Sequence, residues 1–140
     1  MFNLSTKKLI VLVIILVTPL TIFEEKLFDY FWPNHPVEKV VVNGKTFDLE
    51  FANNQKEREK GLSGRDSLPD DHGLFFVFDQ PDYYGFWMKE MKFPIDIVWF
   101  DKNKKVVGIT RNLTPESYPK IFYPPQKIKY ALEVNAKIIP

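Results

Sequence analysis

The apolar residues of this chain follow two different patterns. Near the N-terminus, Leu9–Phe23 is one unbroken run without charge, preceded by Lys7 and Lys8 and followed by Glu24. From residue 38 onward, the apolar residues come in short runs separated by polar and turn-forming residues. The first pattern is typical of a segment that enters a membrane, and the second of a domain built from short β-strands.

The N-terminal run predicts a signal anchor or signal peptide over residues 1–26. A basic flank, an apolar run and a polar exit are the features of an export signal. No small-x-small cleavage pattern precedes the polar exit, so an uncleaved anchor is favoured over a cleaved signal, with a buried core helix as a third alternative. The run is shorter than the roughly 20 residues that span a bilayer, but the aromatic cluster at Phe28–Trp32 would extend it at the membrane surface.

The same residues predict where the rest of the chain lies. Lys7 and Lys8 are expected on the cytoplasmic side, which places the remainder outside the cytoplasm. Residues 27–37 contain Pro33 and Pro36 and are expected to form a stiff linker, because proline fixes φ and holds the preceding residue extended. We therefore expect a single-pass protein of the cell membrane with residues 38–140 outside; secretion after cleavage is the alternative.

The start of this second part carries two specific local signals. Asn43-Gly44 separates two β-branched and aromatic runs, and this pair favours a type I′ turn, so a β-hairpin is expected. Asn54 followed three residues later by Glu57 resembles a capping box and predicts a short helix that runs to Lys60. Gly61 is expected to end that helix in the left-handed conformation.

Further short runs predict strands at Leu74–Phe78, Phe86–Met88, Ile95–Phe100, Val106–Thr110 and Tyr130–Val134. Asp79–Gly85 is expected to be a loop. Asn112–Gln126 contains four prolines and predicts a long ordered loop. The expected fold class is therefore mainly β: a small β-sandwich or barrel-like domain with one short helix, preceded by the membrane segment.

The amino-acid composition excludes several kinds of partner and of catalytic or metal site. The chain has 140 residues with 19 Lys and Arg against 18 Asp and Glu, and a net charge of +1, which argues against a nucleic-acid partner bound through a large basic surface. The absence of cysteine excludes disulfides, thiolate catalysis and cysteine-bound metal. Two histidines cannot form a three-histidine site. We expect no cofactor and no metal ion.

Five stretches in order resemble one bacterial and archaeal family. They are Glu57-Arg58 with Gly61-Leu62-Ser63-Gly64-Arg65, then Gly73-Leu74-Phe75-Phe76-Val77-Phe78, Phe86-Trp87-Met88-Lys89, Pro94-Ile95-Asp96-Ile97, and Leu132-Glu133-Val134-Asn135-Ala136. Their order and spacing are similar to the family catalogued as domain of unknown function 192, over nearly all of residues 38–139. The resemblance implies a compact β-rich fold, frequently behind an export signal, and implies no established activity.

The chain departs from the family pattern at several positions. Ser63 stands where methionine is usual, Glu90-Met91 where Asn-Thr is common, and Lys137 where glycine is usual. The sequence also stops at Pro140, whereas the family usually continues to a further strand. Either the chain is truncated or that strand is dispensable.

The polar and aromatic residues inside these stretches are the candidate binding cluster. They are Arg58, Arg65, Trp87, Lys89, Asp96, Glu133 and Asn135. Because side chains alternate along a strand, Glu133 and Asn135 should share one face, and Asp96 should point away from its apolar neighbours.

Three interpretations of this cluster stay open. In a structural one, Arg58 or Arg65 pairs with Asp96 or Glu133 and fastens the helix to the sheet. In a binding one, the cluster forms a site for a sugar or another polar ligand, with aromatic walls from Trp87, Tyr83 and Tyr84. In a catalytic one, Asp96 and Glu133 act as an acid/base pair.

The leading functional hypothesis is a membrane-tethered extracytoplasmic domain that binds an envelope glycan or protein without catalysis. One alternative is a carboxylate-dependent hydrolase of the envelope. Another is a purely structural or assembly partner, with the proline-rich segment Asn112–Gln126 as its contact surface.

Overall fold

The structure, a computed structural model, describes residues 39–140. These residues contain eight β-strands and one short α-helix, joined by turns and loops. The strands are β1 (Lys39–Val42), β2 (Lys45–Ala52), β3 (His72–Asp82), β4 (Phe86–Trp87), β5 (Ile95–Phe100), β6 (Val106–Leu113), β7 (Ile121–Phe122) and β8 (Ile128–Asn135). The α-helix is α3 (Gln55–Lys60), and a 3₁₀ turn covers Pro115–Ser117. The prediction of a mainly β domain with one short helix is confirmed.

The predicted membrane segment (residues 1–26) and linker (residues 27–37) lie outside the described residues. Within residues 39–140, no helix is long and apolar enough to cross a membrane.

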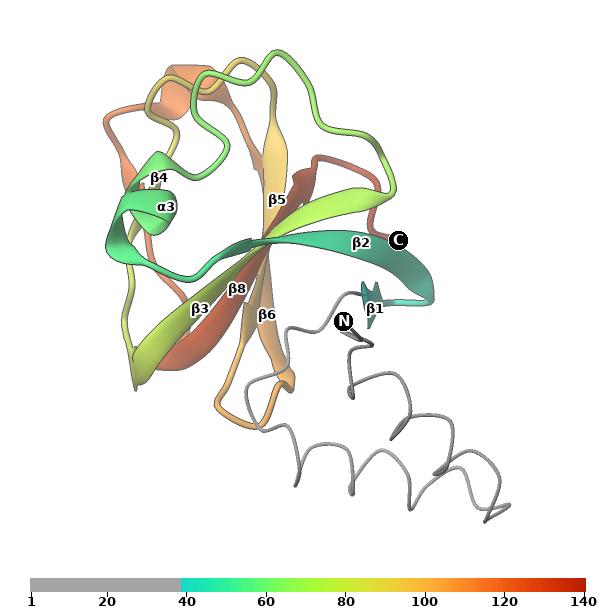
Figure 1. Cartoon of the computed structure of the whole chain (residues 1–140). Coiled ribbons are helices and arrows are strands. Elements are labelled where there is room, and N and C mark those ends of the chain that lie inside the picture. Colours follow the sequence, from blue (N-terminus) through green and yellow to red (C-terminus); the bar gives the residue numbers. More distant parts are fainter. Residues whose placement is uncertain (1–38) are drawn as a thin grey trace, which may run out of the picture. The chain divides into compact units, whose positions relative to one another are not determined.

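Six strands form one curled sheet in the order β1-β2-β3-β8-β5-β6 (Figure 1). All neighbours are antiparallel except β2 and β3, which run parallel and are joined by a crossover that contains α3. Strand β8 lies between β3 and β5, although it follows both in the sequence. The remaining strands, β4 and β7, pair with each other as a separate two-stranded ribbon.

The two local signals near the start of the domain are confirmed. Asn43 and Gly44 both have positive φ, +48° and +81°, as a type I′ hairpin turn requires. The Asn54 side chain accepts a hydrogen bond from the Glu57 amide, and the Glu57 carboxylate accepts in return from the Asn54 amide, so the capping box is complete. Gly61 ends the helix with a positive φ of +50°, but its ψ of −135° lies outside the predicted left-handed helical region.

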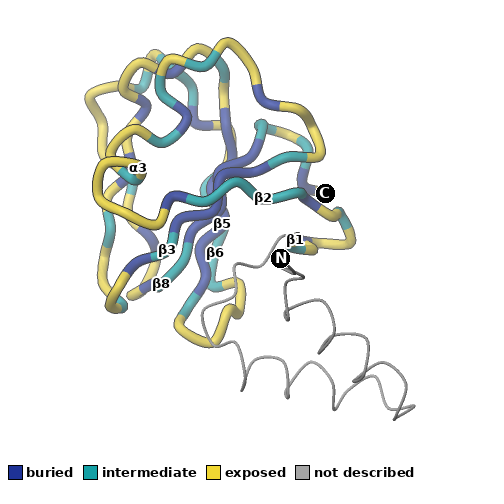
Figure 2. The backbone as a smooth tube through the Cα atoms, in the orientation of Figure 1, coloured by how far each residue is buried: buried dark blue, intermediate teal, exposed yellow. Residues whose placement is uncertain are grey.

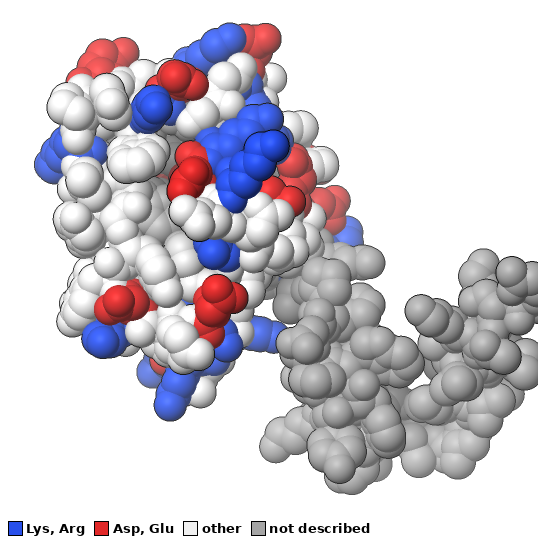
Figure 3. All heavy atoms as spheres, turned by 60° about the vertical axis from the view of Figure 1, so that its left-hand side comes forward, with Lys and Arg blue, Asp and Glu red and all other residues white. Residues whose placement is uncertain are grey.

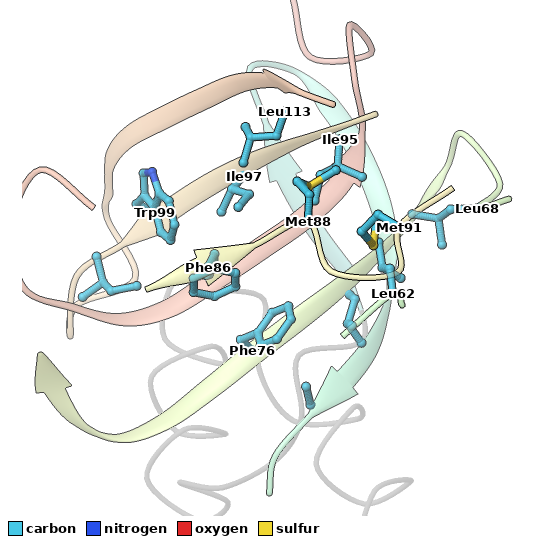
Figure 4. Close-up of a cluster of buried hydrophobic side chains, with 14 of the residues drawn as sticks. Leu62, Leu68, Phe76, Phe86, Met88, Met91, Ile95, Ile97, Trp99 and Leu113 are labelled. Atoms are coloured by element: carbon cyan, nitrogen blue, oxygen red, sulfur yellow. The ribbon is translucent and has the colours of Figure 1, made fainter. Parts of the chain in front are cut away.

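Each face of the curled sheet carries its own apolar core. The backbone of the inner strands β3, β5 and β8 is mostly coloured as buried (Figure 2). On one face, Phe76, Ile97 and Trp99 pack with Phe86 of the ribbon (Figure 4). The Phe86 ring meets the rings of Phe76 and Trp99 edge-on, at centroid distances of 4.9 and 5.1 Å. On the other face, the curl of β1 and β2 places Phe47 in the same cluster as strand residues of β5 and β8.

Two predicted loops contain strand structure. Strand β3 continues to Asp82, which pairs with Ile128 of β8 after an irregularity in the register. Ladder hydrogen bonds come from the backbone, so the polar residues after Phe78 did not end the strand as predicted. The proline-rich segment 112–126 contains β7, whose two residues are too few to give a sequence pattern.

Candidate functional site

A cleft of about 240 Å³ lies beside α3, on the face of the sheet that also carries the ribbon. Its walls are aromatic and its rim is charged and polar. The aromatic residues are Phe76, Phe78, Tyr84, Phe86 and Trp87. The polar residues at the lining are Gln55, Arg58, Glu59, Lys60, Ser63, Asp79 and Glu133.

Glu133 is the buried polar group of this cleft. It lies on the central strand β8, opposite Leu74 of β3 and Ile97 of β5, and only 5% of its surface is exposed. Its Oε2 atom has no hydrogen-bond partner within the described part of the chain. A Cβ atom placed on Gly61 would lie 3.5 Å from Oε2, so the end of α3 reaches directly to this carboxyl.

Burial raises the pKa of Glu133 to about 8, while the charge of Arg65 and a backbone hydrogen bond at Leu62 act in the opposite direction. Arg65 forms a bidentate ion pair with Glu50: its two terminal nitrogens donate to the two Glu50 oxygens at 2.8 and 2.7 Å. That pair lowers the pKa of Glu50 and raises the pKa of Arg65. At neutral pH the Glu133 carboxyl is therefore mainly protonated and can both donate and accept a hydrogen bond.

One wall of the cleft is a stack of side chains around Phe78 of β3. The Tyr84 ring lies parallel to Phe78 with a centroid distance of 3.6 Å, and its hydroxyl donates to the Gln80 carbonyl at 2.7 Å. The Arg58 guanidinium lies 5.5 Å from the centre of the Phe78 ring and donates to the carbonyls of Asn53 and Val77 at 2.8 and 2.9 Å. These contacts hold the wall in one arrangement.

Three of the seven candidate residues line the cleft: Arg58, Trp87 and Glu133. Trp87 is 44% exposed, so its ring is accessible to a ligand. Arg65 does not line the cleft and acts on Glu133 through its charge. Among the three aromatic residues expected as walls, Trp87 and Tyr84 line the cleft and Tyr83 does not.

Asp96 lies on the opposite face of the sheet from Glu133. In the ladder between β5 and β8, Asp96 is opposite Val134 and Ile97 is opposite Glu133, and paired residues share a face. The Asp96 carboxylate accepts hydrogen bonds from the amides of Asn112 and Lys137 at 2.7 and 3.2 Å, and Arg111 lies 3.8 Å away. The two carboxyls therefore do not form the acid/base pair that the catalytic interpretation needs.

The last two candidates also lie outside the cleft lining. The Asn135 amide donates to the Leu68 carbonyl and to Asp70 at 2.6 and 2.8 Å, which fastens the loop before β3. Lys89 is exposed, and its carbonyl accepts a hydrogen bond from the Ser63 hydroxyl at 2.7 Å. The structural interpretation expected Arg58 or Arg65 to pair with Asp96 or Glu133, and no such direct pair is formed. Arg58 donates to backbone carbonyls, and Arg65 binds Glu50.

The phenylalanine walls could not be predicted from the sequence, because aromatic residues in strand runs ordinarily belong to the core. Phe76 and Phe86 are indeed buried and also face the cleft. Within residues 39–140, no group of three or more metal-ligating side chains occurs.

The chain resembles proteins of unknown or unproven function. The DUF192 family model, described as "Uncharacterized ACR", matches residues 38–139. A crystal structure named as a putative transcription regulator from Sinorhizobium meliloti 1021 is 28% identical with a TM-score of 0.65, over 72% of this chain and 79% of that one. A protein of unknown function from Novosphingobium aromaticivorans is also 28% identical, with a TM-score of 0.66 and 71% of each chain covered. No curated protein matches the chain.

Proposed function

This chain belongs to the DUF192 family, and we propose that its domain binds a sugar unit of an envelope glycan in the cleft without cleaving it. The observation that carries the proposal is the Glu133 carboxyl, buried in the cleft with one oxygen unpartnered. A buried polar atom without a partner costs free energy, so its persistence in a cleft favours a ligand that supplies the missing hydrogen bond.

The surroundings of Glu133 favour a sugar over other small ligands. A sugar ring presents an apolar face that stacks on an aromatic plane and hydroxyls at its edge that donate and accept hydrogen bonds. Trp87 offers an exposed ring at the cleft, and the protonated Glu133 carboxyl matches an uncharged hydroxyl. Arg58 and Lys60 are balanced at the lining by Glu59 and Asp79, so the lining has no strong preference for a charged ligand.

The location of this activity is part of the same proposal. The pattern of residues 1–26 supports a membrane anchor, with the binding domain outside the cytoplasm where envelope glycans occur.

The raised pKa of Glu133 also favours a second candidate function, hydrolysis, because a carboxyl that stays protonated at neutral pH can act as a general acid. Glycoside hydrolysis requires a second carboxylate across the scissile bond. Asp96 cannot supply it from the other face of the sheet. Glu59 and Asp79 also line the cleft, but both are exposed to solvent, and Glu59 accepts a hydrogen bond from Gln55. We therefore expect no release of new reducing ends from glycan incubated with the full-length chain, and release that Glu133→Gln abolishes would establish the hydrolase instead.

The binding proposal is tested by titrating the full-length chain with N-acetylglucosamine, glucose and galactose. At least one of them should change the tryptophan fluorescence, and Trp87→Phe should remove that change. Glu133→Leu should weaken binding about ten-fold, because the sugar loses its buried hydrogen bond.

Asp96→Asn is the matched control, because it alters a buried carboxyl on the opposite face and should leave the sugar affinity unchanged. The proposal fails if none of the three sugars binds, or if Glu133→Leu binds as the unmodified chain does.

A further inference from the structure

The outer face of the β4–β7 ribbon is an exposed aromatic patch. Among residues 39–140, seven large hydrophobic side chains are exposed, and five of them belong to the ribbon or lie within three residues of it in the sequence. These five are Tyr83, Trp87, Tyr118, Ile121 and Tyr123. Exposed aromatic residues gathered on one element are unusual on a solvated surface and mark a contact site.

The pairing of the ribbon explains why these side chains point outward. Phe86 pairs with Phe122, and Trp87 pairs with Ile121. Because side chains alternate, Phe86 and Phe122 face the core while Trp87 and Ile121 share the outer face. This outer pair is 44% and 43% exposed.

Gly85 allows the patch to be continuous. A Cβ atom at this position would lie 2.6 Å from Cγ2 of Ile121 and 3.0 Å from the Tyr123 ring. Ile121 and Tyr123 therefore lie directly against the Gly85 backbone, two residues before Trp87 in the same segment. The patch also meets the cleft here, since Gly85 and Trp87 both line it.

We propose that the cleft and the outer face of the ribbon form one extended site for a glycan chain, with one sugar held by Glu133 and Trp87 in the cleft and a neighbouring sugar stacked on Tyr123. This inference rests on the proposed function and adds that the ligand is an oligosaccharide or polysaccharide. The continuity of the patch with the cleft supports it, as does its make-up of rings that carry polar edges, which suits a ligand with alternating apolar faces and hydroxyls.

The test compares N-acetylglucosamine with its β-1,4-linked tetramer, both titrated calorimetrically into the full-length chain. The tetramer should bind at least about ten-fold more tightly, since each stacked ring adds an aromatic contact. Tyr123→Ala should reduce the tetramer affinity to that of the monomer and leave the monomer affinity unchanged. Val106→Ala is the control, because Val106 is also exposed but lies on β6 and not on the ribbon or beside Gly85.

The outcomes separate the extended site from the proposed function. If monomer and tetramer bind equally and both depend on Glu133, the extended site is overturned, the sugar site stands, and the ribbon is left as a contact surface for a protein. If neither sugar binds, both proposals are overturned. Should Tyr123→Ala unfold the domain, nuclear magnetic resonance of the unmodified chain decides: the tetramer must shift the Tyr123 ring signals and the monomer must not.

Discussion

Glu133 is a carboxyl in an environment that differs strongly from water. Its pKa in the folded domain is about 8, against an ordinary value of 4.5. Between these two pH values the folded state holds a proton that the unfolded state has released. The contribution of Glu133 to the free energy of unfolding is therefore largest below about pH 4.5. It declines as the pH rises and stays at its lowest value above about pH 8.

Replacement of Glu133 by glutamine should remove this dependence. We expect Glu133→Gln to gain stability relative to the unmodified chain as the pH rises, by up to about 1.4 kcal/mol per pH unit between the two pKa values. Urea unfolding of both proteins at several pH values from about pH 5 to about pH 9 measures the difference. Carboxyls with lowered pKa, such as Glu50 and Asp66, occur in both proteins and cancel in the comparison. If the free energies of unfolding of the two proteins changed in parallel with pH, the raised pKa of Glu133 would be contradicted.

Asp96 shows what sequence patterns could and could not predict at single residues. Alternation along each strand correctly placed Asp96 opposite its apolar neighbours, and Glu133 on the same face as Asn135. It could not show that the two carboxyls lie on opposite faces of the sheet, because that depends on the register between β5 and β8. Arg65 is similar: its partner Glu50 lies on β2, and nothing in the local sequence connects the two.

Asp96→Asn should destabilise the domain by about 1–3 kcal/mol, because one carboxylate oxygen that accepts a backbone amide is replaced by a donor. Asp101→Asn is the comparison: both backbone amides there donate to the same oxygen, Oδ1, in an exposed turn, so asparagine can keep both hydrogen bonds and a smaller loss is expected. Thermal unfolding of the two variants makes the comparison, and equal losses would contradict the role given to the second Asp96 oxygen.

At the scale of elements, the apolar runs and the complete local signals were predicted, and the two-residue strand β7, which is stabilised by a distant partner, was not. The β1–β2 hairpin follows from Asn43-Gly44, and α3 from its capping box. Strand β7 has only two residues, and it exists because Phe122 packs on the core beside Phe86. The segment predicted as a loop therefore contains β7, the second strand of the ribbon.

Gly85→Ala should disturb this ribbon. The added methyl group would overlap Ile121 and press on Tyr123, at a cost of about 1–3 kcal/mol. Gly44→Ala is a suitable control, since its Cβ would meet nothing within 4 Å and the strain of its positive φ alone costs about 1–2 kcal/mol. Amide exchange should accelerate in β4 and β7 for Gly85→Ala only. Unchanged exchange there would show that the ribbon does not depend on the close approach at Gly85.

At the scale of the whole molecule, the charge is nearly balanced, and positive and negative side chains are interspersed on the face shown in Figure 3. Binding to a nucleic-acid backbone requires a cluster of cationic groups that displace counterions. Although one similar structure is named as a putative transcription regulator, we expect the full-length chain not to retard random duplex DNA at about 0.15 M salt. Retardation that weakens steeply with added salt would contradict this.

The central place of β8 has a consequence for how the protein is made. Strands β1 to β3 and the β5–β6 hairpin emerge from the ribosome first, yet both groups adjoin β8, which is synthesised after them. Until β8 arrives, β3 and β5 each present an unpaired apolar edge, the kind of surface that draws chains into aggregates. The strand that carries Glu133 therefore completes the six-stranded sheet, and the cleft beside it forms only once that strand is in place.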